Sequence, residues 1–136
     1  MIDDSVINKI NQIEHCLQRI DEKYQPGLDL REDDDAQDII LLNLTRACEQ
    51  TIKLASQIVR MKKLGIPNTY KDAFVLLEKV GIISSELSQR LQSMAGFRNI
   101  AIHAYQDLNI DILTAILEKE LKVFPEFIKI ILIEID

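Results

Sequence analysis

The sequence predicts an all-α protein, an antiparallel bundle of about five helices that forms one domain over residues 1–136. Apolar residues recur at spacings of three and four along most of the chain, which is the period of an amphipathic helix. Only four glycines and three prolines occur, whereas an all-β fold of many short strands needs more turn residues. With 47% apolar residues, the chain is too rich in core-forming side chains to be disordered and long enough to bury one core.

The first predicted helix begins near Ile2 and ends near Tyr24. Its apolar stripe consists of Ile2, Val6, Ile10, Ile13, Leu17, Ile20 and Tyr24. Pro26 and Gly27 end this helix, because neither residue continues a helical backbone well. Residues 27–35 form a polar connector. We interpret its acidic end as the negatively charged start of the next helix, where the dipole favours acidic residues, rather than as a metal site.

A long second helix is predicted over residues 36–63 and a short third one over residues 70–80. The second helix has a broad apolar face and ends where a Gly-Ile-Pro sequence begins. Thr69 and Asp72 match a capping box, in which the hydroxyl and the carboxylate accept hydrogen bonds from free backbone N–H groups. This box is expected to open the third helix, which a glycine then stops.

The fourth and fifth predicted helices complete the bundle. Ser84 or Ser85 is expected to cap the fourth helix, whose apolar residues are Leu87, Leu91, Met94 and Ala95. Asn109 can cap a fifth helix that continues to Ile135. Pro125 lies inside that helix and is predicted to kink it, since proline cannot donate the helical hydrogen bond.

The formal net charge is −6 and the isoelectric point is about 4.9. An acidic protein does not bind polyanions such as RNA, DNA or anionic lipid non-specifically, so any contact with phosphate must come from a local cationic site. Cys16 and Cys48 lie within apolar helical patterns and predict reduced core residues. The chain shows no signal peptide, and the apolar residues 123–135 are too few and too charged to cross a membrane. A cytoplasmic protein is therefore expected.

One stretch, residues 95–105, differs from an ordinary helical scaffold. It places Arg98, Asn99, His103 and Tyr105 among apolar neighbours. Together these side chains can bind a phosphate, transfer a proton near neutral pH and offer a hydroxyl group. On residue types alone, however, an Arg, a His and a Tyr near a helix end are more often hydrogen-bonded packing residues than catalytic ones. On an ideal helix Asn99 and His103 share a face, while Arg98 lies roughly 140° away from His103.

The same stretch resembles the Arg-x4-His-x-Tyr signature of the HepT-like branch of the HEPN superfamily, which has an up-and-down four-helix core. The resemblance is specific over residues 64–113, and over the first two helices it is a matching helix layout. The residues that carry it are Ile66, Pro67, Thr69, Tyr70, Phe74, Leu76, Leu77, Gly81, Leu87, Arg90, Leu91, Met94, Ala95, Gly96, Phe97, Arg98, Asn99, His103 and Tyr105.

The resemblance implies the toxin of a toxin–antitoxin pair, a metal-independent RNA endonuclease that works as a homodimer with both motifs lining one cleft. It implies that Arg98 and His103 are catalytic and that Asn99 is a supporting polar residue. The partner it implies is an MntA-type nucleotidyltransferase, which transfers AMP from ATP to Tyr105 and silences the toxin. RNA is the implied substrate, and no cofactor is expected.

The residues suit this chemistry. Cleavage of RNA without a metal needs a base for the 2′-hydroxyl, an acid for the leaving 5′-oxygen and a cation for the phosphorane. His103 can be base or acid because its ordinary pKa is near 6.5, and Arg98 stays protonated and can bind two phosphate oxygens. A dimer supplies two copies of each. The expected products carry a 2′,3′-cyclic phosphate and a 5′-hydroxyl.

Other functional classes are less well supported. No HExxH, Walker A or GxGxxG motif occurs, and His15 has no second ligand at metal-binding spacing, so it is expected on a helix surface. One alternative is a non-catalytic HEPN-type companion of a minimal nucleotidyltransferase, and another is a helical dimerisation domain. A homodimer is also favoured by an apolar surplus in the last helix that one domain is not expected to bury fully. This surplus comprises Phe124, Phe127, Ile128, Ile131 and Ile135.

Basic residues on the other helices could add a rim to an RNA cleft, although solvated helix faces explain most of them better. They are Arg46, Arg60, Lys62, Lys63 and Arg90.

Overall fold

The computed structural model describes residues 3–103 and 109–135, and for residues 98–103 it describes the backbone alone. Within these residues the chain forms six α-helices, one short 3₁₀ helix and no strand, which confirms the all-α prediction. The elements are α1 (Asp4–Lys23), η1 (Leu30–Glu32), α2 (Asp34–Met61), α3 (Asp72–Lys79), α4 (Ser85–His103), α5 (Ile110–Lys119) and α6 (Val123–Ile135).

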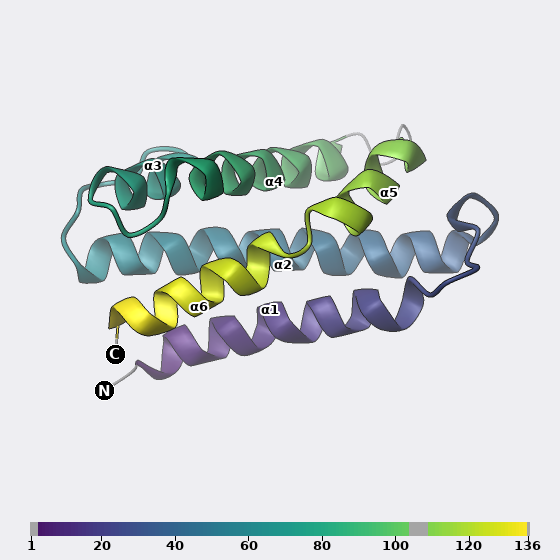
Figure 1. Cartoon of the computed structure of the whole chain (residues 1–136), viewed down its shortest axis with the longest axis horizontal. Coiled ribbons are helices and arrows are strands. Elements are labelled where there is room, and N and C mark those ends of the chain that lie inside the picture. The colour runs from purple at the N-terminus through teal and green to yellow at the C-terminus, as the bar shows by residue number, and fades with distance from the viewer. Residues whose placement is uncertain (1–2, 104–108, 136) are drawn as a thin grey trace.

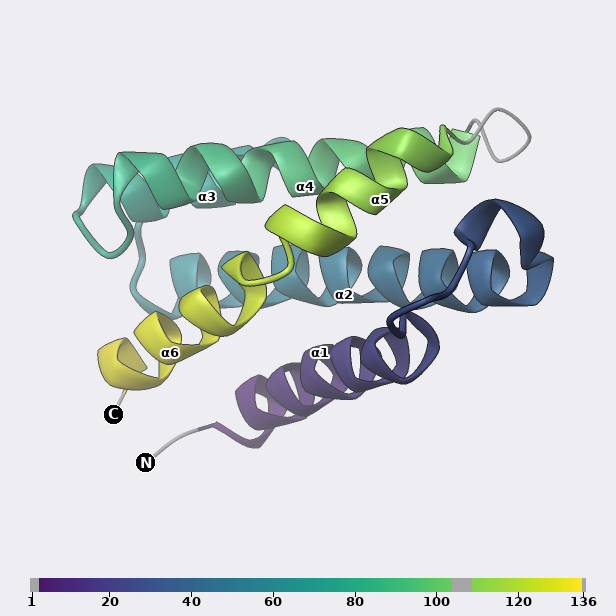
Figure 2. The same ribbon diagram turned by 45° about the vertical axis from the view of Figure 1, so that its right-hand side comes forward.

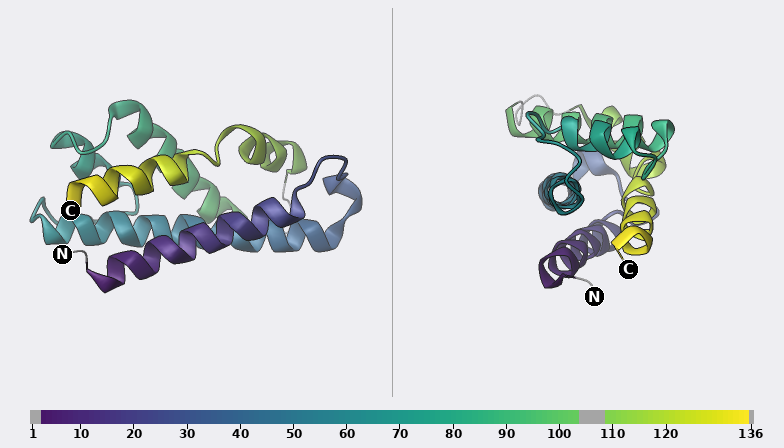
Figure 3. Two further views of the ribbon diagram at one scale, coloured as in Figure 1. Left: turned by 60° about the horizontal axis from the view of Figure 1, so that its bottom comes forward. Right: turned by 90° about the vertical axis from the view of Figure 1, so that its left-hand side faces the viewer.

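The long helix α2 lies in the middle of the molecule (Figure 1). α1 runs antiparallel to it on one side and makes the most extensive contact with it. α3 and α4 lie on the opposite side of α2, as the end view in Figure 3 shows. α5 and α6 return along the flank of the bundle, so that α6 contacts both α1 and α4 (Figure 2). The core therefore lies between α2 and the helices that surround it.

The first two helices form as predicted because their ends are capped by acidic side chains. The Asp3 carboxylate accepts the backbone N–H of Ser5 at 2.7 Å, at the start of α1. The Asp33 carboxylate accepts the N–H of Ala36 at 2.9 Å. This bond confirms that the acidic run opens a helix. The connector is less polar than predicted, because Leu30 is buried in the core.

The short third helix begins later than predicted, at Asp72 rather than at residue 70. The Asp72 carboxylate accepts the backbone N–H groups of Asn68 at 2.8 Å and Thr69 at 3.0 Å. The predicted carboxylate is therefore in place, but the predicted cap by the Thr69 hydroxyl is wrong, because the residue before α3 is Lys71 and it makes no side-chain capping bond. Hydrogen bonds from Asn68 and then from Thr69 lower the pKa of Asp72.

The predicted fifth helix is wrong in one respect, since the chain forms two helices there instead of one kinked helix. α5 ends at Lys119 and α6 begins at Val123. Pro125 lies in the first turn of α6, where a missing N–H leaves no helical hydrogen bond unmade. The helical path breaks one turn before the proline because the ring would clash with the carbonyl four residues earlier.

The prediction that one domain cannot bury the apolar side chains of the last helix is also wrong, because a single copy of the chain buries most of them. Phe124, Phe127 and Ile131 are at most 1% exposed, and Ile128 is 6% exposed. The Phe127 ring packs edge-to-face on that of Phe74, with centroids 6.0 Å apart. α6 packs between α1 and α4. The sequence pattern alone does not show this arrangement. None of the helices in the described residues is long and apolar enough to cross a lipid bilayer.

Candidate functional site

The motif residues Arg98, Asn99 and His103 all lie in the C-terminal part of α4, whose backbone is helical through His103. Asn109 caps the next helix, α5, by accepting the N–H groups of two residues of its first turn, at 2.9 and 3.2 Å. Tyr105, between the two helices in sequence, lies outside the described residues. The motif is therefore placed at the junction of α4 and α5.

A serine sets the start of the motif helix. Of the two caps that the sequence allows, Ser84 is the one used. Its hydroxyl accepts the N–H of Leu87 at 3.1 Å, and its carbonyl accepts the N–H of Ser88 at 2.9 Å. This start fixes the register in which every later residue of α4 is presented.

The regular backbone places the motif on two faces of α4. Arg98 follows the buried residues Leu87, Leu91 and Met94 by eleven, seven and four positions, so its position continues their row along the helix. His103 is five residues after Arg98, which corresponds to a rotation of about 140°. Arg98 and His103 of one copy therefore do not share a face, whereas Asn99 and His103 do.

The motif helix is held to α3 by a buried polar contact. Ser88 is fully buried, and its hydroxyl donates to the carbonyl of Phe74 at 3.5 Å and accepts from the Gln92 amide at 3.0 Å. A buried hydroxyl without hydrogen-bond partners costs free energy. These bonds therefore favour one packing arrangement of α4 on α3.

On its opposite flank, α4 is held by an arginine that pairs with two carboxylates. Arg90 Nε lies 3.5 Å from Glu120 Oε2, and its Nη1 lies 3.6 Å from Glu126 Oε2. The guanidinium therefore joins α4 to the segment that contains the α5–α6 break. It is neutralised there, so the predicted contribution of Arg90 to a basic rim is not supported. Lys62 is engaged in the same way, 3.1 Å from Glu134.

A groove of about 520 Å³ lies between α4 and α5, next to the motif. Its apolar lining comprises Met94, Phe97, Ile112 and Ile116. Ile112 is 54% exposed at its edge. Helix spacing does not predict this groove, because spacing shows which residues share a face but not which face stays open.

Gly96, at the start of the motif, leaves a further open position on α4. A Cβ atom built at Gly96 would meet nothing nearer than the Tyr70 hydroxyl, at 3.9 Å. Ordinary van der Waals contact at that distance does not require a glycine. A glycine inside a helix costs about 1 kcal/mol relative to alanine, so the described part of this copy gives no reason for it.

The remaining predictions about individual residues agree with the structure. His15 is exposed on α1, as predicted. Cys16 and Cys48 are free and buried, and burial raises the pKa of the Cys16 thiol, which keeps it protonated and unreactive.

Comparison with known proteins identifies the family. The sequence matches the ribonuclease HepT-like family over residues 11–131. It is 42% identical to the mRNA nuclease HepT of Shewanella oneidensis over 96% of this chain and 98% of that protein. The chain belongs to the ribonuclease HepT-like family. The family predicted from the sequence motif is thereby confirmed.

Solved structures of HepT-like proteins have the same fold. A tri-AMPylated HEPN toxin of Shewanella oneidensis in complex with MNT antitoxin matches with a TM-score of 0.90, at 42% identity, over 96% of this chain and 98% of that one. A toxin–antitoxin structure with AMP-PNP also matches at 0.90, with 41% identity, over 95% and 98% of the two chains. YutE of Bacillus subtilis, a cytosolic protein of unknown function, shares the fold alone, with a TM-score of 0.80 at 12% identity over 94% and 86% of the two chains.

Proposed function

We propose that this chain is the toxin of a toxin–antitoxin pair and an endoribonuclease that cleaves RNA without a metal ion. One observation carries the proposal: the sequence holds an intact Arg-x4-His-x-Tyr motif, whose Arg98 and His103 lie in the last turns of α4, in a chain that resembles an mRNA nuclease over nearly its whole length. In this proposal residues 1–136 act as one cytoplasmic domain, Arg98 and His103 are catalytic, and Asn99 supports them.

The chemical roles follow from the side chains. His103 takes the proton of the 2′-hydroxyl or gives one to the leaving 5′-oxygen, because imidazole changes charge near neutral pH. Arg98 binds the non-bridging phosphate oxygens and stabilises the charge that grows on the phosphorane. Asn99, one helical turn before His103, is placed to orient it or the phosphate.

We further propose that the nuclease is a homodimer whose two motifs line one cleft. The register of α4 supports this, since Arg98 and His103 of one copy lie about 140° apart around the helix. A second copy supplies the group that one helix end cannot present on the same side. Gly96 lies seven residues before His103, on the same side of α4. It supports close approach to this side by a second copy or by the RNA backbone, because it keeps the surface free of a side chain. The apolar groove between α4 and α5 offers a surface on which a base can stack.

We propose that an MntA-type nucleotidyltransferase silences this toxin by transferring AMP from ATP to Tyr105. The structural relatives support this partner, because one is an AMPylated toxin bound to an MNT antitoxin. Each AMP attached through the tyrosine oxygen adds about one negative charge and a bulky nucleoside. The charge competes with substrate phosphate for Arg98, and the nucleoside obstructs the cleft.

The catalytic assignment is tested by expressing three variants without the partner gene. Arg98→Ala and His103→Ala should each abolish growth arrest and RNA cleavage while the helical circular dichroism spectrum is kept. Lys53→Ala, at an exposed basic residue on α2, is the control and should stay toxic. A wild-type chain that folds and leaves both growth and RNA intact would instead favour the non-catalytic companion.

A further inference from the structure

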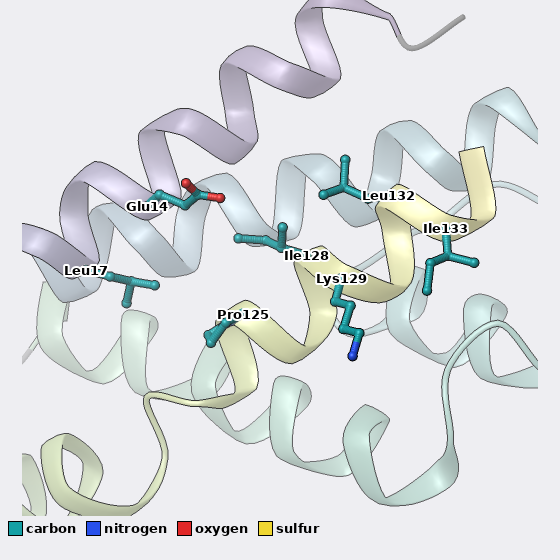
Figure 4. A pocket seen from close by; sticks show the side chains of 7 residues that line it. All are labelled: Glu14, Leu17, Pro125, Ile128, Lys129, Leu132 and Ile133. Carbon is teal, nitrogen blue, oxygen red and sulfur yellow. The ribbon is translucent and has the colours of Figure 1, made fainter. Parts of the chain in front are cut away.

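An apolar groove follows the line where α6 lies beside α1 (Figure 4). Its volume is about 550 Å³, and it is lined by Glu14, Leu17, Pro125, Ile128, Lys129, Leu132 and Ile133. A second hollow of about 320 Å³ shares Leu17 and Pro125 with it and continues to Asp21 and Lys122. Ile133 is 69% exposed at one end. The two hollows form one surface, which we call the α1–α6 groove.

Charged residues border this groove in a regular pattern. The α1 edge carries Glu14 and Asp21, seven residues apart, and the α6 edge carries Lys122 and Lys129, also seven residues apart. A spacing of seven residues places Glu14 and Asp21 on the same face of α1, whereas Lys122 lies just before the first residue of α6 and borders the second hollow. One edge of the groove is therefore acidic and the other basic. None of these four residues forms an ion pair in the part of the chain that the structure describes.

The charges also lie level with one another across the groove. α1 and α6 run antiparallel (Figure 1), and Glu14 lines the same hollow as Lys129, whereas Asp21 lines the same hollow as Lys122. Figure 4 shows Ile128 and Leu132 on the side of α6 nearer α1, while Lys129 projects away from α1. The groove thus has an apolar floor and two charged edges in register.

We propose that the α1–α6 groove binds the same groove of a second copy of this chain, about a two-fold axis parallel to the groove. Rotation about such an axis leaves every residue at the same height along the groove and exchanges the acidic edge with the basic edge. It places Glu14 against Lys129 of the partner subunit and Asp21 against Lys122 of the partner subunit, four charge pairs in all. A two-fold axis across the groove would instead set acid against acid. An isologous contact of this kind buries the apolar floors and Ile133 against each other.

This pairing is separate from the one proposed at the motif and does not depend on the nuclease activity. The residues that line the groove belong to α1, α5, α6 and the segment between α5 and α6, and not to α4, so the two surfaces share no residue. Loss of the groove contact is therefore expected to leave the smaller assembly that the motif pairing forms by itself.

Charge reversal tests the pairing with the full chain. Glu14→Lys/Asp21→Lys makes both edges basic, and Lys122→Glu/Lys129→Glu makes both acidic, so each double variant alone repels its own copy. Light scattering should give a smaller mass than that of the wild type for each one. An equimolar mixture should regain the wild-type mass, because every basic edge then meets an acidic one. Glu22→Lys/Glu32→Lys, with the same change of charge outside the groove, should keep the wild-type mass.

Three results would overturn the proposal. The double variants could keep the wild-type mass, the mixture could fail to reassociate although both variants show native circular dichroism, or the wild-type groove could bind only another protein. The last case is recognised when the variants keep their mass but no longer bind a co-expressed nucleotidyltransferase. RNA cleavage is measured in parallel, so failure of the nuclease proposal is seen independently.

Discussion

Replacing Phe127 by alanine is expected to destabilise the fold strongly, because one copy of the chain buries the whole ring. The side chain is 0% exposed, and its ring meets that of Phe74 edge-to-face at 6.0 Å and 74°. A buried Phe→Ala change costs about 3–5 kcal/mol of unfolding free energy, of which the aromatic pair contributes roughly 0.5–1.5 kcal/mol. For a chain of this length the melting temperature should fall by roughly 10–20 °C.

The assay is urea unfolding followed by circular dichroism, at two protein concentrations a hundredfold apart. If the ring is buried within one copy, the loss of free energy should be the same at both concentrations. Val80→Ala, at a position that is 54% exposed, is the control and should change stability by less than about 0.5 kcal/mol. A loss below about 1 kcal/mol for Phe127→Ala, or one seen only at high concentration, would refute the packing of α6 described above.

Three further predictions concern the helix caps and the proposed AMP acceptor. Ser84→Ala removes the cap of α4 and should cost about 1 kcal/mol, with faster amide hydrogen exchange in the first turn of α4 only; no change would mean that Ser85 can replace it. Asp72→Asn should lower the free energy of unfolding at pH 7. A carboxylate whose pKa is lowered by folding stabilises the fold at pH values above its ordinary pKa of 3.8. That difference should shrink as pH falls below 3.8, and urea unfolding at pH 7 and pH 2.5 measures it. Tyr105→Phe should stay toxic with the antitoxin and ATP present and gain no AMP mass, and AMP addition to this variant would place the acceptor elsewhere.

The helices and their caps could be predicted from sequence because they depend on local patterns. The apolar stripe of α1 and the acidic start of α2 both lie within a few residues of what they specify. The division of the last helix was missed, because Pro125 is compatible with either a kink or a break one turn earlier. The burial of Leu30 in the connector was missed for a different reason, since no periodic pattern surrounds it.

Features that join distant segments were beyond the sequence patterns. Arg90 was interpreted as part of a basic rim, yet its partners Glu120 and Glu126 lie thirty or more residues away. The burial of Phe124 and Phe127 likewise depends on where α6 is seated between α1 and α4. For the candidate site, the sequence could supply the residue types and their register on α4. The open groove beside them follows only from how α5 packs.

The central claim is that this chain cleaves RNA through its own side chains, and the ends of the fragments test it most directly. Purified protein should be incubated with RNA in EDTA, and the products analysed by mass spectrometry. Catalysis by His103 and Arg98 predicts fragments with a 2′,3′-cyclic phosphate and a 5′-hydroxyl, absent with His103→Ala. Cleavage that stops in EDTA and returns with magnesium, or fragments with a 3′-hydroxyl and a 5′-phosphate, would contradict the account.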